Sequence, residues 1–345
     1  VDLSPTASYK QVCTRLEEVQ LRIAAHTDSV LESLLPSLRE ECRFRDWRFD
    51  DSIPPNQPFR LDLLAELASV CEDVDWHYAR DCKAGLGLGV SPPLSDCLHF
   101  PLKTESRLQN VDYVAWSRNY KSAETMVDEV QACLAEDLAM DVVEGGYTWA
   151  ELCARLRLPR GTQEPDPTIR TAQVVPGVAV TRLGCVDESV LADDGSVLLA
   201  KYRLVFDGTV AGVNPQVQLP VLAETPSLLD GEALFSVRQD EPMLGAKIDV
   251  KGAFKRLRLK PNQYPYALFP LAGKWFFSKS LPMGMRASPY LWVRFNSLIH
   301  RLLKRLCMHY SHGSLMYIDD SLYAFKKSQF CTALPLILLV LRLVG

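Results

Sequence analysis

Apolar residues recur at helical spacing through most of the first 160 residues. Within residues 16–24, 61–70 and 124–143 they lie three or four positions apart. This spacing gathers the apolar side chains on one face of a helix, so we predict an amphipathic helix in each stretch. No defensible functional motif accompanies them. The N-terminal region, residues 1–160, is therefore predicted to be mostly helical and of unknown role.

The pattern changes after residue 160. Residues 161–177 combine glycine and proline without periodicity, which predicts a linker. Two β-rich runs, residues 186–190 and 197–206, flank an Asp-Gly pair, and this arrangement predicts a hairpin. Strands and helices then alternate to the end of the chain. The further predicted elements are a strand at 247–250, a hairpin of 266–270 with 274–280, a helix at 288–307, a hairpin of 314–319 with 322–325, and a helix from 328. An α+β fold follows from this order.

Composition places the chain among ordinary globular proteins. It has 345 residues, 48% hydrophobic and 23% charged, which is enough for two or three domains. Its ten cysteines include no CxxC pair, which speaks against a zinc site and favours reduced thiols of an intracellular protein, in the cytoplasm or nucleus and not secreted.

The ends of the chain and its apolar runs add three expectations. The longest apolar run, residues 332–341, is shorter than the roughly 20 residues of a membrane span, so we expect no membrane partner. No basic-then-apolar signal segment precedes the rest. Because the chain starts at Val1 and stops abruptly at Gly345, we expect a fragment of a longer product.

Charge is distributed unevenly. Thirteen basic residues and one acidic residue, Asp249, lie between positions 247 and 306, giving that segment +12 while the whole chain carries −4. Such a local excess attracts phosphate backbones. Solvated helix faces are the alternative, although the lone Asp249 at the end of a predicted strand argues for a placed carboxylate.

Paired carboxylates provide the most specific chemical signal. Tyr317-Ile318-Asp319-Asp320 sets two acids side by side on an apolar strand. Like charges this close raise each other's pKa and resist burial. A hard divalent cation such as Mg²⁺ resolves the conflict, because it prefers carboxylate oxygens.

Asp249 supplies a third carboxylate. Two-metal phosphoryl transfer requires acids from neighbouring strands, because the two ions lie about 3.5–4 Å apart. Asp249, Asp319 and Asp320 fulfil that requirement if the two strands pair. For the Asp-Asp pair alone, a turn or an ordinary surface pair remains the alternative.

Four segments together resemble the reverse transcriptase family. They occur in that family's order, and the resemblance covers residues 178–345. The segments are Lys201-Tyr202-Arg203-Leu204-Val205-Phe206-Asp207 with Asn214, Ala246-Lys247-Ile248-Asp249-Val250-Lys251-Gly252-Ala253-Phe254, Leu281-Pro282-Met283-Gly284-Met285-Arg286-Ala287-Ser288-Pro289, and Tyr317-Ile318-Asp319-Asp320. The pattern looks closest to retrotransposon enzymes.

The resemblance implies a right-hand polymerase core with an antiparallel palm sheet. Fingers would span residues 178–246 and a truncated palm residues 247–345, with thumb and RNase H absent. The implied reaction is RNA-directed DNA synthesis from dNTPs on an RNA or DNA template with a primer. Two Mg²⁺ ions, with Mn²⁺ as the alternative, would bind Asp249, Asp319, Asp320 and the Val250 carbonyl. The oligomeric state is left open.

The same resemblance assigns contacts to the nucleotide. Arg203, and more weakly Lys201, would clamp the triphosphate, with ordinary strand surface charge as the alternative. The backbone N–H groups of Gly252 and Ala253 would cradle phosphate. Phe254 would exclude a 2′-hydroxyl, unless it is simply a core residue.

Another set is implied at the template. Gly284 would let the backbone approach nucleotide and template, and Met283, where relatives often carry Gln, would lie beside it. The remaining template or nucleic-acid residues are Arg286, Ser288, Pro289 and Tyr317. A solvated loop charge is the alternative for Arg286.

Three functions remain open on these residues. The first is an RNA-directed DNA polymerase. The second is an RNA-dependent RNA polymerase, against which Phe254 argues. The third is a decayed retroelement fragment that at most binds nucleic acid.

Overall fold

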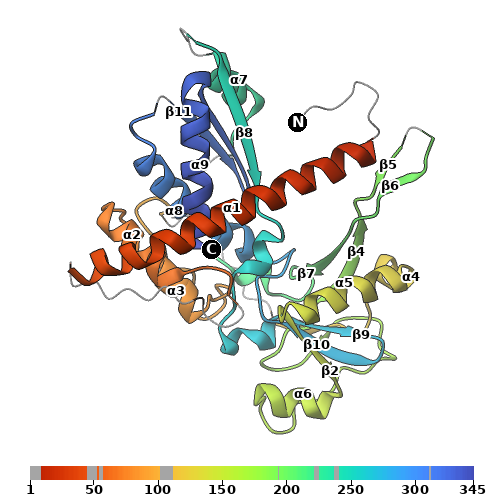
Figure 1. The fold of residues 1–345 in the computed structure, drawn as a ribbon. Coiled ribbons are helices and arrows are strands. Elements are labelled where there is room, and N and C mark those ends of the chain that lie inside the picture. Colours follow the sequence, from red (N-terminus) through yellow and green to blue (C-terminus); the bar gives the residue numbers. More distant parts are fainter. Residues whose placement is uncertain are drawn as a thin grey trace.

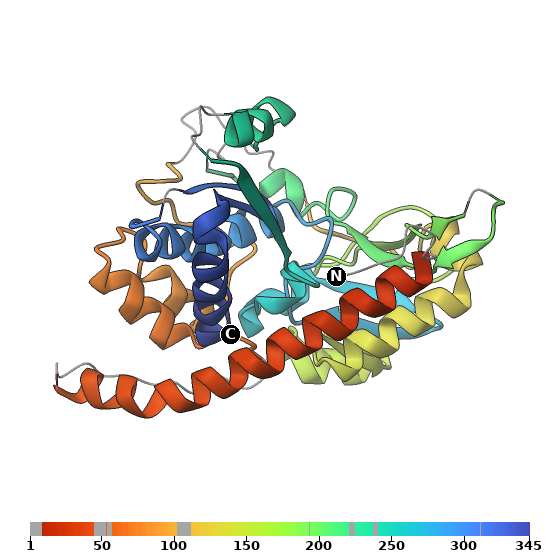
Figure 2. The same ribbon diagram turned by 45° about the horizontal axis from the view of Figure 1, so that its top comes forward.

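A computed structural model describes residues 9–44, 53, 57–101, 112–192, 194–220, 225–236, 241–310 and 312–345. It confirms the predicted α+β class (Figure 1). The first element is a long helix, α1 (Tyr9–Phe44), which crosses the molecule and packs against the last helix, α9 (Lys327–Val344). Figure 2 shows α1 running along one side of the body as far as the helices of the opposite end.

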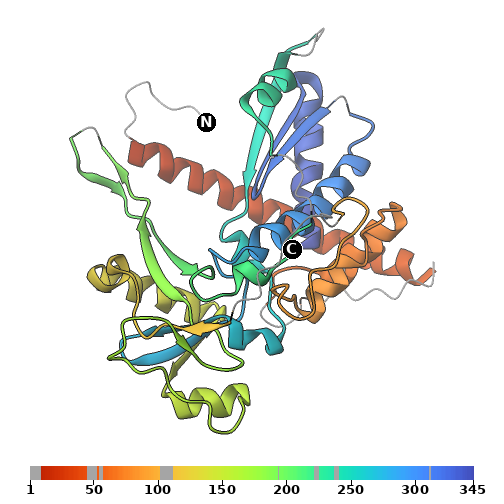
Figure 3. The same cartoon turned by 180° about the vertical axis from the view of Figure 1, so that it is seen from behind.

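A three-stranded antiparallel sheet, the palm sheet, is built from the C-terminal half. Its order is β11 (His312–Tyr317), β12 (Asp320–Lys326), β8 (Met243–Asp249). Helix α8 (Ala287–Leu306) and α9 back this sheet, as Figure 3 shows from behind. Trp292, Phe295 and Phe325 are fully buried in this layer. Half-buried and buried side chains alternate over the first four residues of β12, and the half-buried ones lie on the open face, away from the helices.

A second antiparallel sheet joins distant segments. Its order is β2 (Val143–Tyr147), β10 (Lys274–Ser278), β9 (Leu268–Leu271). The β9–β10 hairpin agrees with the sequence prediction. Strand β2 does not, because residues 124–143 were expected to form one helix. That stretch instead contains the end of α4 (Lys121–Thr125), then α5 (Val127–Ala139), and it ends in β2.

Two short hairpins form a projecting arm, seen at the right of Figure 1. Strand β4 (Arg182–Asp187) pairs with β7 (Tyr202–Asp207), and β5 (Val190–Leu191) pairs with β6 (Val197–Leu199) around the predicted Asp-Gly turn. The predicted strands at 186–190 and 197–206 are thus each divided in two. Asp193, in that turn, lies outside the described residues.

The other elements are short and serve mainly as packing. One of them is the helix that the sequence predicts at residues 61–70. These elements are α2 (Leu61–Val70), α3 (Tyr78–Ala84), α6 (Trp149–Leu156), α7 (Leu228–Ser236), β1 (Val114–Ala115), β3 (Gln173–Val174) and the 3₁₀ turns η1 (Asn214–Gln216), η2 (Ala253–Arg256) and η3 (Pro261–Tyr266).

Packing crosses the boundary that the sequence suggested at residue 160. Strand β2 lies before the boundary and pairs with β10 far beyond it, and β1 pairs with β3 inside the predicted linker at 161–177. The division into an N-terminal region, fingers and palm therefore remains a proposal. In the described part of the chain, these regions share sheets.

Among the described residues, acids of the N-terminal region form ion pairs with four of the thirteen cations in the basic segment. The pairs are Lys255 with Asp137, Lys279 with Asp141 and Glu144, Arg294 with Asp75, and Arg301 with Asp73. The Arg294–Asp75 pair is completely buried. The excess of +12 is thus not one phosphate-binding surface, because these four cations hold the N-terminal region to the palm.

Helix α9 is long and apolar enough, by length and composition alone, to cross a membrane. Inside the fold it contacts α1, α2, α8, β8 and β12. These contacts favour a helix that belongs to the folded body. The absence of a membrane partner stays a prediction.

Candidate active site

The Asp-Asp motif lies in a constrained hairpin turn between β11 and β12. Ile318 adopts a left-handed backbone conformation with φ +54°, which costs a β-branched residue about 1–2 kcal/mol. Two side chains of α8 hold its carbonyl. The Trp292 indole N–H donates to the Ile318 oxygen at 3.1 Å, and the Asn296 amide donates to the same oxygen at 2.9 Å.

The strand register brings the predicted acids together. Asp320 pairs directly with Asp249 across β12 and β8, so both side chains emerge on the open face of the palm sheet. The Val250 N–H donates to the Asp319 carbonyl at 3.3 Å. Residues seventy positions apart in sequence thereby meet at one edge of the sheet.

The electrostatics of this edge are unbalanced. Burial, reinforced by the negative charges of Asp319 and Asp320, raises the pKa of the Asp249 carboxyl, and Lys247 opposes the rise. The Lys247 ammonium lies 2.8 Å from Asp320 Oδ2. The other oxygen, Asp320 Oδ1, is buried without a hydrogen-bond partner.

The donor set suits a hard divalent cation in its chemistry. It offers carboxylate oxygens from adjacent strands and one buried oxygen that lacks a partner. Within the described ranges, however, no three His, Cys, Asp or Glu side chains converge closely enough to hold one ion. Lys247 takes one of the Asp320 oxygens that a metal would need. The metal roles of Asp249, Val250, Asp319 and Asp320 therefore stay predictions.

The loop after β8 contains the predicted phosphate cradle. Gly252 has φ +64°, and a side chain at that position would meet nothing within 4 Å. Its left-handed conformation opens the 3₁₀ turn η2, where Ala253 is buried. Phe254 is half-buried against the main core, which is compatible with both the gate and the core interpretation.

A comparison with known protein families finds a match over residues 211–339. That segment, a little over a third of the chain, matches the family model described as reverse transcriptase (RNA-dependent DNA polymerase). It includes the palm sheet and all three aspartates. The assignment agrees with the family that the four sequence segments resemble.

Solved structures of foamy virus proteins are also similar to this chain. One is the protease-reverse transcriptase in complex with double-stranded DNA, with 19% identity, coverage of 71% of this chain and 35% of that chain, and a TM-score of 0.43. Another is the protease-reverse transcriptase with an RNA/DNA hybrid, with 18% identity, coverage of 71% and 26%, and a TM-score of 0.42. The chain thus spans about a third of the first of these proteins. No curated protein matches it.

In the matched segment, Gly284 allows close packing within the protein itself. It has φ +101°, and a Cβ there would lie 2.1 Å from the Phe206 carbonyl oxygen. The Phe206 N–H donates to the Met283 carbonyl at 2.7 Å. Gly284 thus permits a close approach to the backbone of β7, and its contact with nucleotide and template stays a prediction.

Asn214, in η1, also holds this loop. Its amide donates to the Gly284 carbonyl at 3.0 Å, and its oxygen accepts from the Arg286 N–H at 2.7 Å. The Arg286 side chain is exposed at the N-terminus of α8. A polar residue in a 3₁₀ turn gives no sequence signal for such a role beyond its place in the fingers segment.

The other predicted template residues have different surroundings. Ser288 is buried, and its hydroxyl donates to the Pro282 carbonyl at 2.7 Å, so it stabilises the start of α8. Pro289 lies in the first turn of that helix. Tyr317 is 51% exposed next to the aspartates, where a nucleic acid could reach it.

Lys201 and Arg203, the fingers cations, face an acid of their own chain. Lys201 Nζ lies 3.1 Å and Arg203 Nε 2.8 Å from the same oxygen, Glu188 Oε2. The β4–β7 ladder continues to Glu188, whose N–H donates to the Lys201 carbonyl at 2.8 Å. The two cations are thus gathered at one point, as a phosphate clamp requires, but around a carboxylate.

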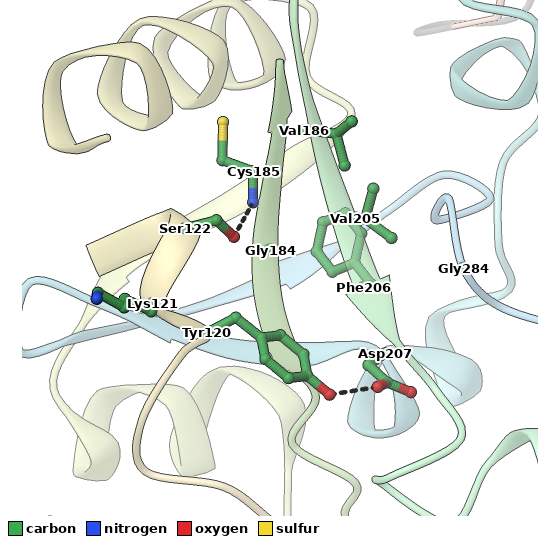
Figure 4. A pocket seen from close by; sticks show the side chains of 10 residues that line it. All are labelled: Tyr120, Lys121, Ser122, Gly184, Cys185, Val186, Val205, Phe206, Asp207 and Gly284. Carbon is green, nitrogen blue, oxygen red and sulfur yellow. Dashed lines mark hydrogen bonds between the residues drawn. The ribbon is translucent and has the colours of Figure 1, made fainter. Parts of the chain in front are cut away.

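A cavity of about 500 Å³ lies at the base of the arm (Figure 4). Residues from α4, β4 and β7 line it, and it extends to Gly284. The Tyr120 hydroxyl donates to Asp207 at its rim, and the Ser122 hydroxyl oxygen accepts from the Cys185 N–H at 3.2 Å. None of the three aspartates lines this cavity, so we attribute it to the junction between the N-terminal region and the arm.

Trp116 and Asn119 also belong to that junction. The Trp116 indole donates to the Val210 carbonyl at 2.9 Å. The Asn119 amide donates to the Pro270 carbonyl at 2.6 Å, and its oxygen accepts from the Leu183 N–H at 2.9 Å. These contacts are structural ones between the N-terminal region, β4 and β9.

Proposed function

We propose that this chain carries the fingers and palm core of an RNA-directed DNA polymerase, which adds dNTPs to a primer 3′-hydroxyl. The observation that supports this most strongly is the register that pairs Asp320 with Asp249 beside the Asp319 turn. An ordinary surface Asp-Asp pair has no need of a third carboxylate on the neighbouring strand. An origin in a retroelement and an intracellular location belong to the same proposal.

The protein's own residues would position the reactants. Asp249, Asp319 and Asp320 would hold two divalent ions on the open face of the palm sheet. When bound, such ions would activate the primer hydroxyl and neutralise charge on the leaving pyrophosphate. The Trp292 and Asn296 donors fix the turn that presents Asp319.

Other groups would orient the nucleotide. The fingers cations would take the triphosphate as paired donors, with Arg203 suited to a bidentate contact. The backbone N–H groups of Gly252, which is exposed, and of Ala253 would donate hydrogen bonds to phosphate. Phe254 would pack under the sugar and exclude a 2′-hydroxyl.

Primer extension tests the proposal. A DNA primer on an RNA template is incubated with dNTPs, MgCl₂ and protein that contains this chain, and Asp319→Asn is the matched isosteric control. We expect the variant to extend the primer at least 100-fold more slowly than wild type, since removal of a group that stabilises transition-state charge lowers the rate by about that factor. Equal extension by both proteins would refute the assignment of the aspartates.

The same assay separates the polymerase classes. We expect dNTP to be incorporated in preference to NTP, and Phe254→Val to reduce that preference. An RNA-dependent RNA polymerase would incorporate NTP without the substitution.

A non-catalytic nucleic-acid-binding module is a second candidate. It is favoured by one observation: in the described part of the chain, no three potential ligand side chains converge on an ion. This function predicts binding of a template-primer duplex that is the same with MgCl₂ and with a chelator, together with no extension.

A further inference from the structure

Lys247 is the cation nearest to the aspartate pair on the open face of the palm sheet. It pairs with Leu322, and Asp249 pairs with Asp320 two positions along, so Lys247 lies diagonally across from Asp320. Its ammonium is 2.8 Å from Asp320 Oδ2. The lysine side chain is 63% exposed and the aspartate side chain 33% exposed, so the ammonium can leave without disturbing the core.

The two carboxylate oxygens of Asp320 have different surroundings. Oδ2 accepts the ammonium, whereas Oδ1 is buried and has no partner. Only one of the two carboxylate oxygens therefore has a partner. This is unfavourable, because a buried acceptor without a hydrogen bond costs free energy.

We infer that Lys247 is the internal counter-ion of the aspartate pair in the ion-free protein, and that a divalent ion must displace it from Asp320. This inference rests on the proposed function, since it concerns the same carboxylates. One ammonium only partly neutralises Asp249, Asp319 and Asp320. It also repels a divalent ion that approaches the same oxygen.

Two consequences follow for the ion-free and ion-bound protein. Without metal, Lys247 reduces the repulsion between directly opposed carboxylates, which would otherwise destabilise the strand pair. With metal, the same charge competes for Asp320. Lys247 therefore lowers the affinity for divalent ions while it stabilises the protein without them.

Calorimetric titration with MnCl₂ tests this directly on the chelator-treated 345-residue chain. The variant is Lys247→Met, which keeps the length of the side chain and removes its charge. Lys274→Met is the matched control, because Lys274 is an exposed lysine on β10, in a different sheet. We expect Lys247→Met to bind Mn²⁺ about tenfold more tightly, which corresponds to about 1.4 kcal/mol. The control should equal wild type.

Thermal unfolding provides a second readout without activity. Lys247→Met should have a lower Tm than wild type in chelator and a larger rise in Tm on addition of MnCl₂. High salt should reduce the difference in affinity, since exposed charges are screened. If the methionine variant fails to fold, Lys247→Gln carries the same expectation.

The possible failures are distinguishable. If wild type binds Mn²⁺, Asp249→Asn abolishes binding, and Lys247→Met binds equally or more weakly, Lys247 positions Asp320 as a ligand and the inference is overturned. If wild type binds no Mn²⁺, or if Asp249→Asn binds as well as wild type, the metal site of the proposed function fails and the inference fails with it.

Discussion

The turn that presents Asp319 should depend on two donors that share one acceptor. Trp292 and Asn296 both donate to the Ile318 carbonyl, at 3.1 and 2.9 Å. Asn296→Leu removes one donor at similar volume and should cost about 1 kcal/mol, the usual net worth of a neutral hydrogen bond. Trp292→Phe removes the other donor and leaves a small cavity in the core, so we expect a cost of about 2 kcal/mol.

The double variant decides whether the carbonyl matters. Each single variant leaves it one donor, but the double variant leaves it none, and an unmet acceptor costs about 1–3 kcal/mol more. That cost is added at a residue already held at φ +54°. We therefore expect a loss larger than the sum of the single losses, with a coupling of about 1–2 kcal/mol.

Equilibrium unfolding in urea measures the three losses, with Ser297→Ala on the same helix as control. Losses that add within about 0.5 kcal/mol would mean that the sites are independent. Water would then satisfy the carbonyl in the double variant, and the two donors would not define the turn. Mn²⁺ affinity of the double variant should fall if the turn positions Asp319.

Three further perturbations follow from ion pairs in the structure. Glu188→Gln should release the fingers cations and raise the affinity for dATP severalfold in a fluorescence titration, whereas unchanged affinity would mean that these cations do not face the triphosphate. Asp75→Asn should cost about 3–5 kcal/mol in urea unfolding, because it leaves a buried arginine without its charge partner; a loss below about 1 kcal/mol would contradict that account. Burial raises the pKa of the Asp137 carboxyl above 3.8, and the charge of Lys255 opposes the rise. The folded state therefore binds this proton more tightly than the unfolded state does. The free energy of unfolding should fall as pH rises from about 4 through the raised pKa. Asp137→Asn should remove this fall, and an unchanged pH profile of unfolding would contradict the assignment.

Local sequence signals predicted the C-terminal elements well. The helix expected at 288–307 corresponds to α8, Ala287–Leu306, and the hairpin with the aspartates is β11 and β12. These elements combine clear periodicity with turn chemistry, so their local preferences and their tertiary contacts agree. Two-metal chemistry predicted that the strand of Asp249 pairs with that of Asp319 and Asp320, but it did not predict the register, because strand register over seventy residues leaves no local trace.

The failures of prediction occur where tertiary contacts override local pattern. The stretch 124–143 is apolar at helical spacing, yet its last residue is Val143, which starts β2. Strand β10 offers an unpaired edge there, and pairing with β2 satisfies it. The packing of Gly284 against the β7 backbone also left no signal in the sequence, because a glycine does not reveal which backbone approaches it.

The charges of the site follow a common logic in its two halves. On the arm, Glu188 gathers the fingers cations where a triphosphate is proposed to bind. On the palm sheet, Lys247 meets Asp320 where a divalent ion is proposed to bind. In both places a side chain of the chain itself has the charge of the proposed ligand and occupies part of its position. A chain that must hold three carboxylates on one sheet edge and two cations on one hairpin, before any ligand arrives, is stabilised by such pairs. A nucleotide would have to displace Glu188 from the fingers cations, and a metal ion would have to displace Lys247 from Asp320. Weakening either ion pair should therefore raise the affinity for the ligand and lower the stability of the ligand-free protein.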